Sequence, residues 1–228
     1  MSLMKRPLNT LILLALSGSV LAQAPAQPPA AGAPAQPPQD TSMSYFVTSV
    51  GLGKGANLGG LAGADAQCKA LAEAAGSKGK HWHAYLSTTG AGGVNAKDRI
   101  GKGPWYNANG VLVARSVEHL HYSNVLLTKE TSVTEKKGIV NGVGDTPNTH
   151  DMLTGSNPDG TASTMTCNNW TSDADTPDLK AMLGHLDRKG GGPMAESWNS
   201  AHSSRGCSQD SLKASGGNGY FYCFATGE

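Results

Sequence analysis

The four cysteines of this 228-residue chain constrain its fold more than any other feature. They are Cys68, Cys167, Cys207 and Cys223, and all of them follow an N-terminal export signal. An even number of cysteines in an exported chain predicts two disulfide bonds, because thiols that leave the cytosol meet an oxidising compartment. The short CxxC or CxxH spacing of zinc ligands does not occur. We therefore expect disulfides, although the sequence leaves the three possible pairings open.

Residues 1–22 are typical of a signal peptide. Lys5 and Arg6 precede an apolar segment from Leu8 to Leu16, and Val20-Leu21-Ala22 offers a cleavage site with small residues. The apolar segment is shorter than the about 20 residues of a membrane-spanning helix, so we expect no membrane span after cleavage. These features predict an exported protein, either periplasmic or extracellular.

Residues 23–41 predict a disordered linker rich in proline, alanine and glutamine. The segment holds six prolines and no apolar side chain larger than these, so it cannot bury a core. Residues 42–228 have a length that suits one folded domain. Removal of the two basic residues of the signal peptide leaves 16 basic against 17 acidic residues, and this balance offers no basic surface for nucleic acid.

The domain shows few regular elements in its sequence. Aromatic and β-branched residues predict strands at 45–50, 82–86, 110–114 and 220–224. Apolar residues spaced by three and four predict one strong helix that is capped by Asp65 or its neighbour and ended by Gly76. Cys68 lies on the buried face of this helix. Between residues 133 and 193 turn residues dominate, which predicts a long irregular region held by a crosslink.

Several motifs together resemble the C-type-lectin-like superfamily, in the branch that includes endostatin and bacterial exported endostatin-like domains. The resemblance covers residues 43–228 and implies an α+β fold: a twisted antiparallel sheet, flanking helices and a long loop region. It also implies nested disulfides, Cys68–Cys223 and Cys167–Cys207. The motifs are NLGGLAGADAQC (57–68), HAYLS (83–87), LTGSNPDG (153–160), CNNW (167–170), SWNSAH (197–202), RGC (205–207) and YFYC (220–223).

The chain departs from this superfamily in its metal-binding motifs. Calcium-dependent sugar-binding members carry Glu-Pro-Asn or Gln-Pro-Asp together with Trp-Asn-Asp, whereas the nearest strings here are Asn157-Pro158-Asp159 and Asn168-Asn169-Trp170. Calcium needs six to eight oxygen ligands, several of them charged. The zinc-binding N-terminal histidine cluster of endostatin has no counterpart before Tyr45. We therefore expect neither calcium nor zinc as a cofactor.

Two histidine pairs have a spacing that a metal site could use. His81 and His83, and likewise His119 and His121, are two residues apart, so each pair would share one face of a strand. Two such pairs could hold Zn²⁺. We expect His83 to enter a core strand without an acidic partner, and predict no metal site.

The candidate ligand-binding residues are aromatic or polar and cluster around the inner cysteines. Flat aromatic faces and amide or guanidinium donors suit sugars and peptides. Packing on the disulfide is the alternative for the tryptophans, and loop-fixing hydrogen bonds are the alternative for the polar residues. The candidates are Trp170, Trp198, Asn199, His202 and Arg205, with Asn157 and Asp159 in the preceding loop.

The sequence predicts a recognition module and no enzyme. Neither Gly-x-Ser-x-Gly nor His-Glu-x-x-His occurs. His202 with Ser200, Ser203 and Asp210 could be drawn as a catalytic triad, but any serine-rich loop permits such a combination. By analogy with the resembling family, we expect an exported, non-catalytic, lectin-like module that binds a glycan at the cell envelope or outside the cell. The alternative is a protein-binding or structural envelope module, whose partner is an envelope or cell-surface protein. A hydrolase is the third option.

Overall fold

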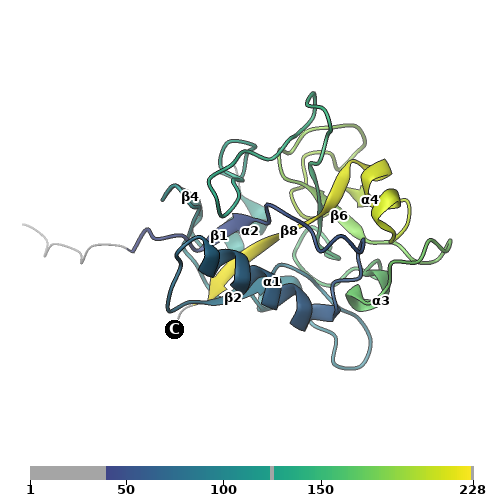
Figure 1. The fold of residues 1–228 in the computed structure, drawn as a ribbon, viewed down its shortest axis with the longest axis horizontal. Helices are drawn as coiled ribbons and strands as arrows, with labels where there is room; N and C mark the ends of the chain where they lie inside the picture. The colour runs from purple at the N-terminus through teal and green to yellow at the C-terminus, as the bar shows by residue number, and fades with distance from the viewer. Residues whose placement is uncertain (1–39, 124–125, 227–228) are drawn as a thin grey trace, which may run out of the picture. The chain divides into compact units, whose positions relative to one another are not determined.

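The first and last strands of the described chain pair with each other inside one six-stranded sheet (Figure 1). The computed structural model describes residues 40–123 and 126–226, which belong to one compact unit, Gln39–Glu228. The predicted signal peptide and almost all of the predicted linker lie outside the described residues. The structure therefore bears on the domain expected at residues 42–228.

The described residues contain eight strands and five helical segments. The sheet has the strand order β1-β8-β5-β6-β7, and β2 also pairs with β8. Its strands are β1 (Tyr45–Val47), β2 (His81–Ala84), β5 (Asp151–Leu153), β6 (Met182–His185), β7 (His202–Ser203) and β8 (Gly217–Thr226). A separate hairpin consists of β3 (Trp105–Tyr106) and β4 (Leu112–Ala114). The helical segments are α1 (Gly60–Ala74), η1 (Ala96–Asp98), α2 (Val117–Tyr122), α3 (Cys167–Trp170) and α4 (Gln209–Ser215). Within residues 40–123 and 126–226, no helix has both the length and the apolar character that a bilayer span requires.

The sheet is mixed, whereas the resemblance implied an antiparallel one. Strand β8 runs antiparallel to β1 and β2, but parallel to β5. Parallel strands need a long connection between them. The chain supplies this connection, because β6, β7 and two helices intervene between β5 and β8. The α+β architecture is confirmed, and the expectation of a purely antiparallel sheet is corrected.

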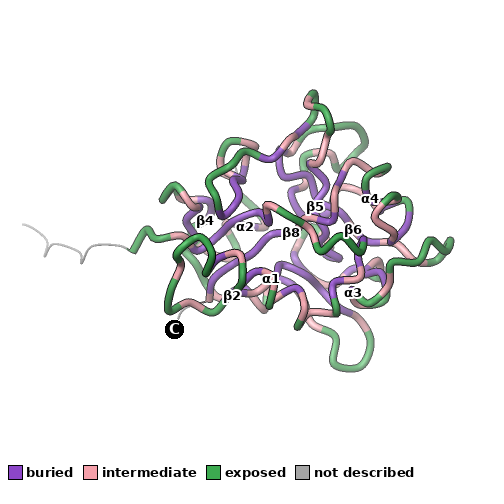
Figure 2. The backbone as a smooth tube through the Cα atoms, viewed as in Figure 1, coloured by how far each residue is buried: buried purple, intermediate pink, exposed green. Residues whose placement is uncertain are grey.

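The central strands of the sheet are largely buried (Figure 2). Their apolar side chains fall into two clusters, one on each face. Along β8 the side chains alternate between the clusters: Phe221 and Cys223 belong to one, and Tyr222 and Phe224 to the other. Helix α1 lies against the first face and contributes Cys68 to it. A strand that is buried on both faces is typically apolar without interruption, which explains the YFYCFA sequence of β8.

Helix α1 is capped by Gly59 and not by Asp65. Gly59 adopts a left-handed conformation with φ 72°, and Asp65 lies inside the helix. The Asp65 carboxylate instead lies 2.6 Å from Arg99 Nη2 and 3.1 Å from His83 Nδ1, and it accepts a hydrogen bond from the backbone N–H of Ala84 at 2.9 Å. The cap prediction is wrong because the helix starts at Gly60, five residues before Asp65, and the Asp65 side chain contacts β2 instead. The carboxylate therefore joins α1 to the sheet.

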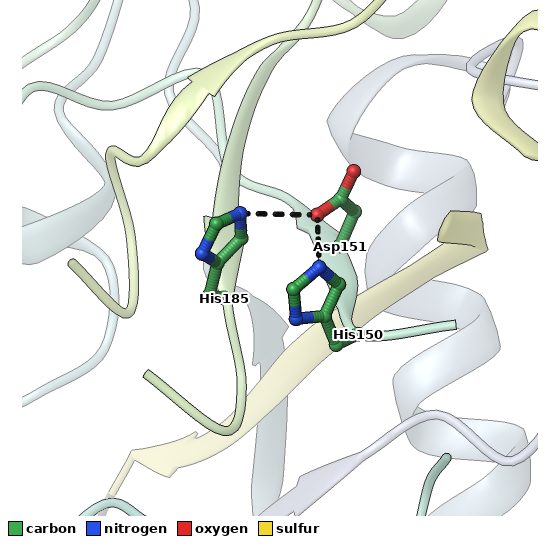
Figure 3. A group of neighbouring side chains, drawn as sticks. All are labelled: His150, Asp151 and His185. Atoms are coloured by element: carbon green, nitrogen blue, oxygen red, sulfur yellow. Dashed lines mark ion pairs between the residues drawn. The ribbon is translucent and has the colours of Figure 1, made fainter. Parts of the chain in front are cut away.

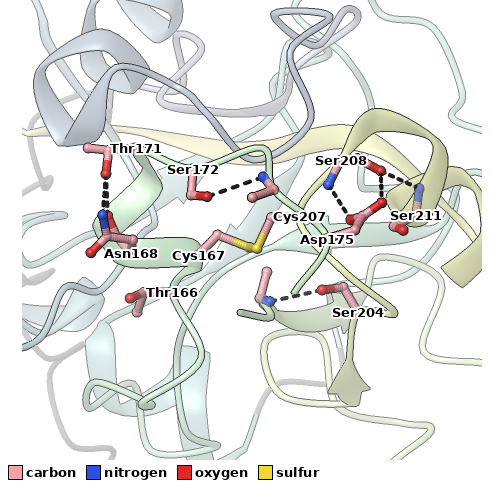
Figure 4. Close-up of a disulfide and its surroundings, with 12 residues drawn as sticks. Thr166, Cys167, Asn168, Thr171, Ser172, Asp175, Ser204, Cys207, Ser208 and Ser211 are labelled. Carbon is pink, nitrogen blue, oxygen red and sulfur yellow. Dashed lines mark hydrogen bonds between the residues drawn. A yellow bond between two sulfur atoms is a disulfide. The ribbon is translucent and has the colours of Figure 1, made fainter. Parts of the chain in front are cut away.

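Two disulfide bonds hold the domain, and their pairing is the nested one that the resemblance implied. Cys68–Cys223 links α1 to β8 across 155 residues of sequence. Cys167–Cys207 links α3 to the chain just before α4 across 40 residues (Figure 4). All four cysteines are paired. Two such bonds are typical of an oxidising, extracytoplasmic compartment.

Simultaneous replacement of Cys68 and Cys223 by serine should destabilise the domain more than loss of the inner bond. Loop-closure arithmetic assigns about 5 kcal/mol to a bond that closes 155 residues and about 4 kcal/mol to one that closes 40. Because a whole domain has about 5–15 kcal/mol of net stability, the first variant should be largely unfolded at 37 °C. Chemical denaturation of both double variants measures this order. An unchanged midpoint for Cys68→Ser/Cys223→Ser would contradict it.

Replacement of Asp65 by alanine should lower the free energy of unfolding by about 1–3 kcal/mol, since a charged hydrogen-bonding group between α1 and β2 is lost. Glu73→Ala is the matched control, because Glu73 is an exposed carboxylate of the same helix that pairs with Lys69. An exposed pair of this kind contributes about 0–1 kcal/mol. If urea denaturation shows that Asp65→Ala and Glu73→Ala lower the free energy of unfolding equally, Asp65 does not join the helix to the sheet.

Candidate functional site

Three histidine rings surround one oxygen of a buried aspartate. The Oδ1 atom of Asp151 lies 3.3 Å from the Nε2 atoms of both His150 and His185 (Figure 3). The Nε2 atom of His202 lies 3.5 Å from the same oxygen. The rings of His150 and His185 are stacked, with centroids 4.2 Å apart. These four residues are termed the histidine–aspartate cluster.

Three neighbouring strands bring the cluster together. Asp151 begins β5 and stands directly opposite His185, the last residue of β6. His202 begins β7 and stands opposite Leu183 of β6. Residues two apart on a strand share one face, so His202 lies diagonally across from His185 on that face. His150, immediately before β5, supplies the third ring.

Backbone carbonyls hold the second nitrogen of two of these rings. The Nδ1 atom of His185 lies 2.8 Å from the carbonyl oxygen of Ala195, and that of His202 lies 3.1 Å from the carbonyl oxygen of Ser203. A carbonyl oxygen only accepts hydrogen bonds, so Nδ1 carries the proton in both rings. In a neutral imidazole, Nε2 is then the unprotonated nitrogen. In their neutral forms, both rings therefore direct a lone pair toward Asp151.

A second carboxylate holds the third ring. The Nδ1 atom of His150 lies 2.9 Å from Oδ1 of Asp187. Burial would raise the pKa of Asp187, but the hydrogen bond with His150 and those from the backbone N–H groups of Val143 and Lys189 outweigh it and lower the pKa to about 2. Asp187 is therefore an ionised acceptor that orients the His150 ring.

The Asp151 carboxylate has no hydrogen-bond partner among the described residues. Its side chain is fully buried, and Oδ1, Oδ2 and the Nε2 atom of His185 are all without a partner. Burial lowers the pKa of His185, whereas the hydrogen bond that a protonated ring would donate to Asp151 raises the pKa of His202. The ligand atoms of His150, Asp151 and His185 lie within 4.8 Å of one another, a spacing at which one ion could contact all three.

The chain that follows β6 and Asp187 forms a loop, residues 188–197, against the cluster. Its two ends are joined, because the Arg188 Nε atom donates a hydrogen bond to the carbonyl oxygen of Glu196 at 3.0 Å. A Cβ atom added at Gly190 would lie 3.1 Å from Cε1 of His185, so the loop backbone passes close to this ring. The loop lines a hollow of about 690 Å³.

Three of the predicted ligand-binding residues are buried: Trp170, Trp198 and Asn199. The indole N–H of Trp170 donates to the carbonyl oxygen of Ser87 at 2.8 Å. Trp198 packs on Tyr85, with ring centroids 4.6 Å apart. Trp170 shares an apolar cluster with Cys167 and Cys207, in line with the packing alternative, whereas Trp198 belongs to the other cluster. In the described structure both tryptophans offer almost no face to a ligand.

The Asn199 amide fixes the loop that contains Asn157 and Asp159. Its Nδ2 atom donates to Tyr85 Oη and to the carbonyl oxygen of Asn157, each at 3.0 Å. Within that loop, the Asp159 carboxylate accepts hydrogen bonds from the backbone N–H and the hydroxyl of Thr161 at 3.0 and 2.6 Å. These polar residues hold the loop in the described structure.

The last two predicted binding residues have different surroundings. His202 contacts Asp151 and so belongs to the histidine–aspartate cluster, whereas the Asp210 of the formal triad lies in α4. Arg205 is exposed, and its backbone N–H donates to Ser215 Oγ at 2.9 Å. The structure therefore does not gather the predicted residues into one surface.

The histidine pairs singled out in the sequence are not the ones that converge. His83 lies on β2, and its Nδ1 atom lies 3.1 Å from Asp65, so the expectation that it lacks an acidic partner is wrong. His119 and His121 lie in α2, a helix, where residues two apart do not share a face. Of the cluster, sequence reasoning had selected only His202. The overlooked signal is the pairing of histidine with nearby aspartate in His150-Asp151 and in the string HLD at 185–187.

The fold and crosslinks define a class of protein: a disulfide-locked α+β domain with a mixed sheet and long loops around it. Residues 52–186, more than half of the chain, match the family described as Protein of unknown function (DUF1554), and the chain belongs to this family. The matched segment includes His150, Asp151 and His185, and it ends before His202. No curated protein matches the chain.

Replacement of Asn199 by alanine should lower the free energy of unfolding by about 1–3 kcal/mol, because a buried amide that bonds Tyr85 and Asn157 is lost. Arg205→Ala removes an exposed side chain and should change the free energy of unfolding by no more than about 0.5 kcal/mol. Thermal and urea unfolding of the two variants measure the difference. If Arg205→Ala were the more destabilising change, Asn199 would not have the structural role described.

Proposed function

We propose that the protein is an exported, non-catalytic recognition domain of the C-type-lectin-like class, which binds a glycan in the hollow of the 188–197 loop. The observation that carries the proposal is the hollow itself. Its volume of about 690 Å³ falls within the about 300–1,000 Å³ that is usual for small-ligand sites. The two disulfide bonds support a periplasmic or extracellular location.

The position of the loop favours recognition. Binding residues commonly lie on loops that a rigid scaffold positions, and this loop starts where β6 ends. Both of its ends are held, by the bond from Lys189 N–H to Asp187 and by the bond between the His185 ring and the Ala195 carbonyl. Anchored ends limit the conformations of the loop, which reduces the entropy lost on binding.

The lining of the hollow offers both polar and apolar contacts. Glu196 and Ser197 supply hydrogen-bonding groups, and Pro193 and Met194 supply an apolar surface. The Met194 side chain is unusually open for its type, with 41% of the residue exposed. A sugar ring has hydroxyl groups at its rim and apolar C–H faces, so this lining suits a glycan. The buried Trp170 and Trp198 take no part in this site.

The double change Glu196→Gln/Met194→Ala should weaken glycan binding at least about tenfold, the equivalent of about 1.4 kcal/mol. A glycan array screened with the exported wild-type chain identifies the ligand, and isothermal titration then compares the variants. Glu73→Gln/Val111→Ala is the matched control, because it alters one exposed carboxylate and one exposed apolar residue that do not line the hollow. Wild-type affinity in the loop variant would refute the assignment of the site.

A protein partner is the second candidate, and exposed apolar residues favour it. Ile139, Val50 and Val143 are 55%, 48% and 44% exposed. Ile139 also lines a hollow of about 260 Å³ together with Tyr220. Exposed apolar groups of this kind are typical of protein-binding surfaces when they are contiguous. A folded wild-type chain that binds no glycan on the array would favour this alternative over the lectin-like function.

A further inference from the structure

We propose that His150, Asp151, His185 and His202 form a tetrahedral site for a divalent transition metal of the zinc type. In a tetrahedral zinc site the metal–ligand bonds of about 2.0–2.1 Å place neighbouring ligand atoms about 3.3–3.4 Å apart. The three imidazole Nε2 atoms lie 3.3, 3.3 and 3.5 Å from the Asp151 Oδ1 atom. Each imidazole therefore lies at that distance from Asp151, and the ligand atoms of His150, Asp151 and His185 also lie within 4.8 Å of one another. His202 approaches Asp151 from the exposed side, as the proposed fourth ligand.

The chemistry of these four atoms calls for a cation between them. The carbonyl partners of His185 and His202 fix the proton of the neutral ring on Nδ1, so each Nε2 atom then points a lone pair at a carboxylate oxygen. Two acceptors that face each other repel. The Asp151 oxygens and the His185 Nε2 atom are also buried and lack hydrogen-bond partners among the described residues. Buried polar atoms are rarely left in this state.

A single proton satisfies this arrangement less completely than a metal ion does. One added proton would join Asp151 to a single ring, and the other two rings would still present lone pairs to the same oxygen. A divalent cation at the centre attracts all three nitrogens and the carboxylate at once. It would also compensate the charge of Asp151, whose side chain is fully buried.

The outer hydrogen bonds have the pattern found around metal-binding histidines. Such histidines nearly always donate their other N–H to a carboxylate or a backbone carbonyl, which fixes the tautomer and the ring orientation. Here the acceptors are the Asp187 carboxylate for His150 and carbonyl oxygens for His185 and His202. All three rings are therefore held with Nε2 next to the Asp151 carboxylate before any ion binds.

The strands and the loop give this site both rigidity and access. Three of the four residues lie on β5, β6 and β7, which are hydrogen-bonded neighbours in the sheet. Sites built on regular elements hold their geometry more closely than sites built on loops. Three of the side chains are at most 6% exposed, whereas that of His202 is 38% exposed. An ion can therefore reach the site on the side of His202.

The ligand types indicate which metal fits. Calcium and magnesium prefer shells of oxygen atoms, and this set offers a single carboxylate. Imidazole nitrogen with one carboxylate suits zinc and its neighbours in the first transition row. Copper(II) and nickel(II) favour square-planar or tetragonal arrangements, which the observed spacing does not match. Zn²⁺ is therefore the expected ion, and Co²⁺ is its spectroscopic substitute.

The test is direct metal binding by the exported chain with its disulfides formed. The protein is stripped with EDTA, dialysed, loaded with Zn²⁺ and measured by mass spectrometry of the metal and by titration calorimetry. One Zn²⁺ per chain is expected, together with a raised melting temperature, because an ion that binds only the folded state stabilises it. The Co²⁺ form should show the intense visible absorption of four-coordinate cobalt. A wild-type chain that binds no Zn²⁺ would overturn the proposal, as would a Co²⁺ spectrum of six-coordinate type.

Variants assign the ligands. Asp187→Asn should weaken Zn²⁺ binding about 10–100-fold, as loss of an outer partner does. His202→Gln and His185→Asn remove ligands and should weaken binding further. His81→Gln is the matched control, since His81 is an exposed histidine outside the cluster. Equal affinity of His202→Gln and the wild type would overturn the four-residue site. If circular dichroism shows that His185→Asn does not fold, Zn²⁺ binding by His202→Gln and by the wild type still tests the proposal.

The outcome is separable from that of the proposed glycan recognition. A wild-type chain that binds Zn²⁺ but binds no glycan on the array would contradict the recognition function and support the metal site. A wild-type chain that binds a glycan but no Zn²⁺ would do the reverse. The two measurements therefore fail independently.

Discussion

The described domain depends on β8, a strand that is buried on both faces. Its side chains alternate between the two apolar clusters, so neither face of the sheet can form without it. Its backbone pairs with β1 and β2 along the second half and with β5 along the first half. The disulfide from Cys223 then fixes α1 to the same strand. The covalent bond and the apolar burial act on one element, and the other strands take their positions from it.

The candidate sites are positioned by strands that pair, directly or through a neighbour, with β8. Strand β5 pairs with β8, β6 pairs with β5, and β7 pairs with β6, so the histidine–aspartate cluster stands on successive neighbours of β8. The 188–197 loop leaves the end of β6 and returns to the His185 ring. A backbone that is held so closely can place three imidazole rings around a buried carboxylate, an arrangement that a mobile loop would not maintain. The proposed metal site and the proposed binding loop therefore share one support.

The sequence predicted elements whose own residues carry the signal. The apolar run of β8 and the apolar face of α1 were identified, because burial of a strand or of one helix face produces a recognisable spacing of apolar residues in the sequence. Strands β5 and β6 were missed: they are three and four residues long, and β6 contains Gly184 where the chain at Trp198 approaches closely. Helix α3 was not predictable either, since Cys167 to Trp170 all have positive φ, from 46° to 67°. The disulfide, the bonds of Asn169 with Thr89 and the bond of Trp170 with Ser87 hold that conformation.

By itself the sequence determined the near-neutral charge of the domain and predicted its crosslinks, its export signal and its α+β composition of elements, because cysteine count, charge and periodicity are local properties. Only the tertiary structure decided the parallel pairing of β5 with β8, the burial of the candidate tryptophans and the meeting of His150, His185 and His202 at Asp151. These depend on which strands become neighbours. Strand order is set by packing between residues far apart in the chain, and no local pattern records it.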